Sequence, residues 1–209
     1  MAFALGADMR GTSGFVTTDP ANCYYVTQNG TSTYYPITSP QGASWGWGGN
    51  VGNRQADRDN TVDPRLAGIN YCAPGDATLF FEIDLPATGS YQIGLALGDA
   101  SFGNGPMTCT FFDNVTLFST PVTAGSVSAG QWYDASGVLR TSSADWVSNN
   151  ALVTHTFSST VFKVGIIGTV STYATLSHVF IQAAGGGFTP VSRRFDSNVA
   201  RVGTRQMVT

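Results

Sequence analysis

The stretch TLFFEIDLPATGSYQIGLALG, residues 78–98, decides the fold class. Residues 78–85 are rich in branched and aromatic side chains and end at Pro86, and residues 87–89 follow as a short turn. In residues 90–98 large apolar side chains, at Tyr91, Ile93, Leu95 and Leu97, alternate with small or polar ones. Because side chains alternate between the two faces of a strand, this spacing predicts a strand with one buried face. The two runs together predict a β-hairpin.

Similar runs, bounded by Gly, Pro, Asn and Ser, follow at steady spacing, and helical periodicity is nearly absent. The expected strands are residues 24–27, 33–37, 107–118 with a break near Asp113-Asn114, 131–139 with a turn at Gly137, 151–157, 161–167 and 173–182. Residues 45–74 have few strand signals, and we expect a long loop there, ordered because it contains two tryptophans. Short strands at this spacing predict an all-β fold, a two-sheet antiparallel β-sandwich.

The ends of the chain differ from its middle. We expect an N-terminal arm over residues 1–14, a β-sandwich domain over residues 15–182, and a Gly-rich linker with a basic C-terminal arm over residues 183–209. The chain has one lysine, and four of its arginines lie near the C-terminus: Arg193, Arg194, Arg201 and Arg205. Without interleaved aromatic residues these arginines are a weak nucleic-acid signal. A solvated tail is the default interpretation, and an arm that orders on a partner surface is the sharper one, which makes these four arginines partner-docking candidates.

Composition restricts the function classes. Charged residues make up 11% of the 209 residues, against roughly 25% in ordinary soluble chains. The net charge of −3 gives no overall attraction to nucleic acid or to anionic membranes. No apolar run is long enough to span a bilayer, and the N-terminus lacks the features of a signal peptide, so we expect synthesis in a cytoplasm.

Three cysteines, Cys23, Cys72 and Cys109, allow one disulfide and a free thiol, but their apolar neighbours favour three buried thiols.

The segment Asp57-Arg58-Asp59-Asn60-Thr61-Val62-Asp63 places three carboxylates close together. Carboxylate oxygens are the ligands that Ca²⁺ prefers, so Asp57, Asp59 and Asp63 are calcium candidates, the one cofactor considered for this chain. The EF-hand pattern fails, because its glycine and final glutamate are missing. Arg58 and Arg65 interleave with the acids, so internal Arg–Asp pairs are the plainer explanation.

The segment Trp45-Gly46-Trp47 allows two interpretations. Exposed indole rings stack on sugar rings, whereas aromatic residues beside glycines also fill the end of a sandwich core. The preceding residues 42–46 match the G-x-S-x-G pattern of a hydrolase nucleophile. That nucleophile needs a helix after the serine, and the glycines that follow disfavour one, so we expect no enzyme.

Several pieces in order resemble a malectin-like carbohydrate-binding domain. They are Trp45-Gly46-Trp47, Asp57-Arg58-Asp59, Asp63-Pro64-Arg65-Leu66-Ala67-Gly68, the strands within residues 81–93, and Gly98-Asp99-Ala100. The resemblance covers residues 45–101 and implies a galactose-binding-like jelly roll. It also implies carbohydrate-binding candidates among the motif positions, together with the aromatic cluster: Trp45, Trp47, Arg58, Asp59, Asp63, Arg65 and Asp99.

Two functions follow as expectations. The first is a non-enzymatic structural component of a virus particle, a phage capsid decoration, fibre or tail-associated protein that forms homo-oligomers and docks on neighbouring subunits. It rests on the low charge, the all-β pattern and the arms. The second is a free-standing carbohydrate-binding module, which would need an exposed aromatic platform at Trp45 and Trp47. The two overlap, because a virion protein can display a sugar-binding fold to reach its host.

Overall fold

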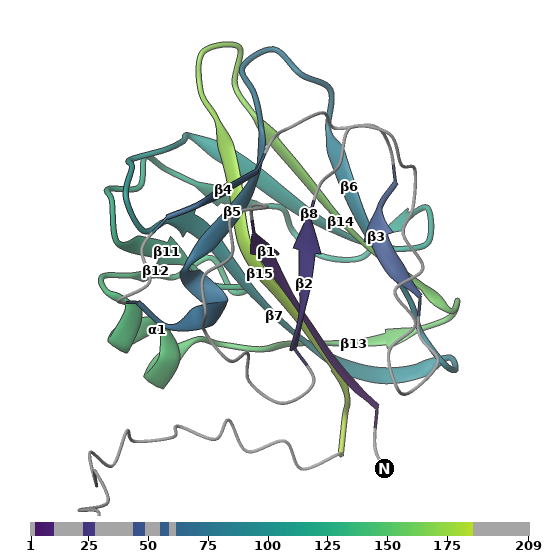
Figure 1. Ribbon diagram of the computed structural model, residues 1–209. Coiled ribbons are helices and arrows are strands. Elements are labelled where there is room, and N and C mark those ends of the chain that lie inside the picture. The colour runs from purple at the N-terminus through teal and green to yellow at the C-terminus, as the bar shows by residue number, and fades with distance from the viewer. Residues whose placement is uncertain (1–2, 11–22, 28–43, 49–54, 59–61, 186–209) are drawn as a thin grey trace, which may run out of the picture.

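A computed structural model describes residues 3–10, 23–27, 44–48, 55–58 and 62–185. Two β-sheets pack face to face in it, as the sequence predicts (Figure 1). The larger sheet has the order β12 (Leu139–Arg140), β11 (Gln131–Tyr133), β7 (Gly89–Asp99), β15 (Ala174–Ala183), β1 (Ala4–Arg10), β2 (Cys23–Thr27), with β13 (Val153–Phe157) beside β7, β5 (Gly68–Cys72) beside β15 and β4 (Gln55–Asp57) beside β5. The smaller sheet has the order β10 (Val122–Ala124), β8 (Met107–Asp113), β14 (Val161–Gly168), β6 (Leu79–Asp84), β3 (Trp45–Trp47), with β9 (Thr116–Leu117) beside β8.

The main core lies between the inner faces of the two sheets. Tyr91, Ile93, Leu95 and Leu97 of β7 are all buried there, which confirms the alternation predicted from the sequence. Facing them are seven apolar side chains of β6, β8 and β14 that are at most 1% exposed: Phe81, Ile83, Cys109, Phe111, Phe162, Val164 and Ile166. Alternation therefore turns the other side chains of these three strands toward the outside of the sandwich.

The predicted hairpin over residues 78–98 is wrong. Both strands form, but β6 pairs with β3 and β14 in the smaller sheet, whereas β7 pairs with β11, β13 and β15 in the larger one. Residues 85–88 therefore cross from one sheet to the other. Two strands that each bury one face against a shared core give the same alternation whether they are neighbours or lie on opposite layers.

The N-terminal segment assigned to an arm contains a strand of the larger sheet. β1 pairs antiparallel with β15, from Ala4 opposite Gln182 to Asp8 opposite His178, and parallel with β2. The β1–β2 pair is the exception among the antiparallel pairs of the described strands. Leu5, Ala7 and Met9 are fully buried in the main core. The four arginines expected to dock on a partner lie beyond residue 185, outside the described residues.

Residues 45–74 also differ from the expected loop, since they contain β3, β4, the short 3-10 helix η1 (Pro64–Leu66) and β5. With the helix α1 (Ser143–Asn149), η1 covers part of the outer face of the larger sheet. The second apolar cluster lies under them and consists of Leu66, Ala96, Trp132 and Trp146. The sequence predicts no helix at α1. None of the helices in the described residues could cross a membrane.

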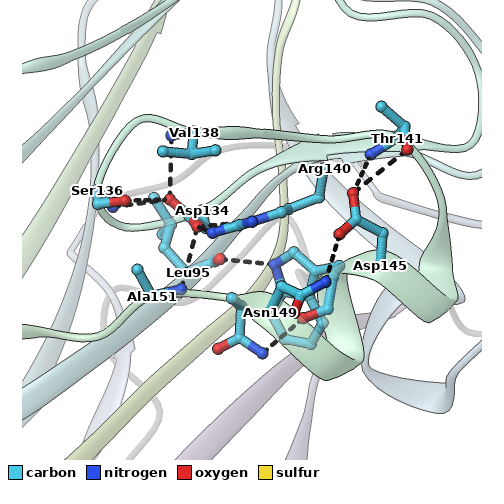
Figure 2. A network of polar contacts seen from close by, with 11 residues as sticks. Leu95, Asp134, Ser136, Val138, Arg140, Thr141, Asp145, Asn149 and Ala151 are labelled. Atoms are coloured by element: carbon cyan, nitrogen blue, oxygen red, sulfur yellow. Dashed lines mark hydrogen bonds and ion pairs between the residues drawn. The ribbon is translucent and has the colours of Figure 1, made fainter.

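A polar network fixes α1 and the β11–β12 turn against this outer face (Figure 2). Asp134 is fully buried, and its two carboxylate oxygens accept six hydrogen bonds. The donors are the backbone and hydroxyl of Ser136, the backbone of Val138, two guanidinium nitrogens of Arg140 and the backbone of Ala151. Burial by itself raises the pKa of Asp134, but the hydrogen bonds from Ser136, Ala151 and Arg140 outweigh it and lower the pKa.

Candidate functional site

The two tryptophans proposed as a sugar-binding platform lie in the core. Trp45 and Trp47 are 1% and 4% exposed, and both rings contact Phe81, with centroids 6.2 and 5.4 Å away. The Trp47 indole N–H donates to Oδ1 of Asn70 over 2.7 Å. Since β3 is a strand, residues 45 and 47 share its inner face. The alternative interpretation, core packing, is confirmed, and an exposed platform at these positions is wrong.

Arg58 and Asp99, 41 positions apart, form an ion pair. Arg58 Nε donates to Oδ2 of Asp99 over 2.9 Å, and the side chain of Asp99 is fully buried. The other carboxylate oxygen of Asp99 accepts the backbone N–H groups of Ser101 and Phe102. The Arg58 guanidinium carbon also lies 4.7 Å from the centroid of the Phe102 ring. The pair ties the end of β4 to the end of β7.

Asp63 and Arg65 form a second ion pair at η1. Arg65 Nε and Nη2 donate to the two carboxylate oxygens of Asp63 over 2.7 and 3.0 Å, and the Arg65 backbone N–H donates to Oδ1 over 3.0 Å. Burial raises the pKa of Asp63, but the hydrogen bonds and charge of Arg65 outweigh it, so the pKa lies below its ordinary value. The backbone N–H of Asp63 donates to Ser143 Oγ, and Arg65 lies over the Trp146 ring. Here the expected internal Arg–Asp pair holds the loop against α1.

Calcium binding in this loop stays a prediction. Asp63 already binds Arg65, Asp59 lies outside the described residues, and so does the side chain of Asp57. Within the described part of the chain, no three His, Cys, Asp or Glu side chains are grouped so that they could hold a metal ion.

Both histidines of the chain have structural partners. His178 is buried, with Nδ1 2.5 Å from Oδ1 of the buried Asp8, and its ring packs edge-on against Trp146. This contact joins β1 to β15 under α1. The histidine thus gives the buried carboxyl group of Asp8 a polar partner inside the protein.

His155 lies on β13 near Asp113, with its Nε2 3.7 Å from Oδ2 of that residue, and its ring stacks on Phe118 at 3.7 Å. The Asp113 carboxylate accepts hydrogen bonds from the hydroxyl and backbone N–H groups of Ser158 and Ser159. Burial raises the pKa of Asp113, but these four bonds outweigh it and lower the pKa. The serine hydroxyls donate directly to the acid rather than to the histidine, so this cluster lacks the Ser–His–Asp order of a hydrolase triad.

The surface that sequence reasoning missed is the outer face of the smaller sheet. It is formed across β6, β14 and β8 by outward side chains on neighbouring strands: Phe80, Glu82, Thr110, Phe112 and Lys163, with Gly165 among them. The rings of Phe80 and Phe112 meet edge-on across β14, with centroids 5.7 Å apart, and Phe80 is 37% exposed. Lys163 donates to Glu82 over 3.1 Å beside them.

Gly165 leaves room for the Phe80 ring. It pairs with Phe80 on one side and with Thr110 on the other. A Cβ atom at this position would lie 2.9 Å from the Phe80 ring and 2.8 Å from the Thr110 hydroxyl oxygen, closer than real contacts allow. The sequence held one usable signal, the consecutive phenylalanines 80–81 and 111–112. In a strand, one member of each such pair must face outward.

Comparisons with known proteins give no family for this chain. No protein-family model matches it, and no curated protein matches it. Among solved structures, a family 35 carbohydrate-binding module from Clostridium thermocellum is 13% identical, with a TM-score of 0.31 over 52% of this chain and 73% of that one. The N-terminal CBM22-1–GH10 modules of endo-1,4-β-D-xylanase 10B from the same organism, complexed with xylohexaose, are 11% identical, with a TM-score of 0.26 over 58% of this chain and 25% of that one.

Both TM-scores lie below 0.5, so neither likeness bears on how this chain works. The resemblance to malectin-like domains stays a prediction from the sequence pattern. The β-sandwich itself rests on the strand pairings described above.

Proposed function

We propose that this chain is a non-enzymatic binding domain that docks on its partner through the outer face of its smaller sheet. The observation that carries the proposal is the pair of outward rings, Phe80 of β6 and Phe112 of β8, which contact each other across β14. Aromatic side chains exposed on a sheet lose apolar contact with water when a partner covers them, so such a pair favours binding. The outer face of the larger sheet differs, because α1 and η1 cover part of it, over Ala96 and Trp132.

The docking test compares the wild-type chain with the double variant Phe80→Ser/Phe112→Ser. Sedimentation velocity measures self-association, and a panel of immobilised polysaccharides measures adhesion. We expect the wild-type chain to show one of these interactions and the variant to lose it. A wild-type chain that does neither, or a variant that keeps the interaction, would contradict the proposal.

We propose a virus particle as the setting of this domain. The support is compositional: a charged fraction of 11% and a single lysine suit a protein packed against neighbouring subunits. The measurement is mass spectrometry of gradient-purified particles from the source material. Peptides of this chain at a stoichiometry comparable to other particle proteins are the expected result, and their absence from the particle fraction argues against this setting.

A further inference from the structure

We infer that the outer face of the smaller sheet binds a neutral polysaccharide. The inference rests on the proposed docking function and names the partner of that same face. It is carried by the arrangement of three kinds of side chain: two contacting aromatic rings, hydroxyl groups around them, and one ion pair whose charges cancel.

The aromatic rings supply the apolar part of the site. Phe80 and Phe112 meet at an interplanar angle of 71°, so the two rings present a face and an edge rather than one flat surface. Sugar rings have apolar C–H faces and a polar rim of hydroxyl groups. A sugar unit lying along β14 can therefore place a C–H face on the exposed Phe80 ring while its rim reaches the strands on either side.

Hydrogen-bonding groups surround the rings at the positions that such a rim would reach. Thr110 lies opposite Gly165, and Thr108 lies one step further along β8 opposite Ile167. Thr78 is close enough to Gly165 that a Cβ there would lie 3.0 Å from its methyl group. Threonine hydroxyls both donate and accept, which matches sugar hydroxyls.

Charge decides between a neutral and an acidic ligand. Lys163 is the only lysine of the chain, and its Nζ lies 3.1 Å from Glu82 Oε1 on the adjacent strand. Both side chains are partly exposed, at 23% and 20%. A carboxylate or phosphate placed here would meet Glu82 as well as Lys163, whereas neutral hydroxyls can accept from Lys163 and donate to Glu82.

A protein partner fits the face less well. Stable protein interfaces bury about 800 Å² on each side around an apolar centre depleted of charge. Here two charged side chains lie beside the ring pair: Lys163 on β14 and Glu82 on the adjacent strand β6. Covering them with a protein would desolvate both charges, whereas a sugar chain leaves room for water at its rim.

The experiment is native affinity electrophoresis in gels containing barley β-glucan or galactomannan as neutral probes, or polygalacturonate as the acidic one. We expect the neutral probes to slow the wild-type chain, and Phe80→Ser/Phe112→Ser to bind at least roughly tenfold more weakly, because two apolar contacts are lost. Val170→Ser is the matched control, since Val170 is 87% exposed on the β14–β15 turn, beyond the end of β14. The single variant Phe112→Ser, with its fold checked by circular dichroism, replaces the double variant if that fails to fold.

Glu82→Gln tests the charge argument separately. The variant leaves Lys163 uncompensated, so we expect polygalacturonate to slow it more than it slows the wild-type chain. Wild-type binding that prefers polygalacturonate, or retardation by neutral probes that survives Phe80→Ser/Phe112→Ser, overturns the inference. If the chain self-associates through this face but no probe slows it, the polysaccharide inference is overturned and the docking function still stands. If the chain shows neither self-association nor retardation, both the inference and the docking function are overturned.

Discussion

Replacing Asp134 with asparagine tests the polar network that fixes α1 and the β11–β12 turn (Figure 2). Each carboxylate oxygen accepts three hydrogen bonds: Oδ1 from Ser136 and Val138, and Oδ2 from Arg140 and Ala151. Asparagine has the same shape but one NH₂ group in place of an oxygen. In either orientation of the amide, that NH₂ group faces three donors, and Arg140 loses its counter-charge.

The expected cost follows from this geometry. Removing one partner of a buried ion pair costs about 3–5 kcal/mol, a large fraction of the roughly 5–15 kcal/mol that holds an ordinary domain folded. At this chain length each kcal/mol shifts Tm by roughly 2–4 °C, so we expect Asp134→Asn to lower Tm by about 6–20 °C.

Scanning calorimetry at pH 7, with urea unfolding for the free energy, measures the effect. Asp145→Asn is the control, because Asp145 belongs to the same region but is partly exposed and accepts from Thr141 and Asn149, which water can replace. We expect a far smaller shift for it. A loss below about 1 kcal/mol for Asp134→Asn would refute the view that this network holds the outer layer in place.

Three further predictions concern two buried acids, Gly165 and Cys109. Because their pKa values are lowered, Asp113 and Asp134 stabilise the fold fully above the ordinary carboxyl pKa of about 4 and lose that effect as the pH falls below it. The free energy of unfolding, measured with urea between pH 7 and pH 3, should therefore fall as the pH is lowered. A flat profile would contradict this. Gly165→Val should displace the Phe80 ring, lower the free energy of unfolding by about 1–3 kcal/mol and weaken polysaccharide binding. Calorimetry and affinity gels measure the two effects. Unchanged stability and binding would show that the Phe80 ring has room for a larger side chain at this position. Burial raises the pKa of the Cys109 thiol, so Cys109 should resist a thiol reagent at pH 8 until the chain is unfolded, and rapid labelling of the native chain, located by peptide mapping, would show the site to be open.

The alternation of buried and outward side chains along single strands was predictable from the sequence, but the neighbouring strand to which each one pairs was not. Tyr91 and Leu97 point into the core as expected, yet β6 and β7 lie in different sheets. β1 escaped prediction because it has no β-branched or aromatic side chain and because Asp8, polar in the sequence, is buried against His178, 170 positions away. α1 escaped because it has only seven residues, and its register rests on the Ser142 cap and on burial of Trp146.

The candidate site shows the same limit. Aromatic residues beside glycine are compatible with a platform or with a core, and only the pairing of β3 with β6 places Trp45 and Trp47 inside. The Arg–Asp pairs were predictable in type, since the charges interleave, although Asp99 as the partner of Arg58 was not. The outer Phe80–Phe112 contact needs β6 and β8 to flank β14, which no local pattern indicates.

The most direct test of the central claim is an NMR titration of the chain with a soluble galactomannan oligosaccharide. It follows the threonine methyl signals and the indole N–H signals together. If the outer face of the smaller sheet is the binding surface, the methyl signals of Thr78, Thr108 and Thr110 shift, while the indole signals of the buried Trp45 and Trp47 stay in place. Shifts confined to other parts of the chain, or no shifts at saturating oligosaccharide, would contradict the account.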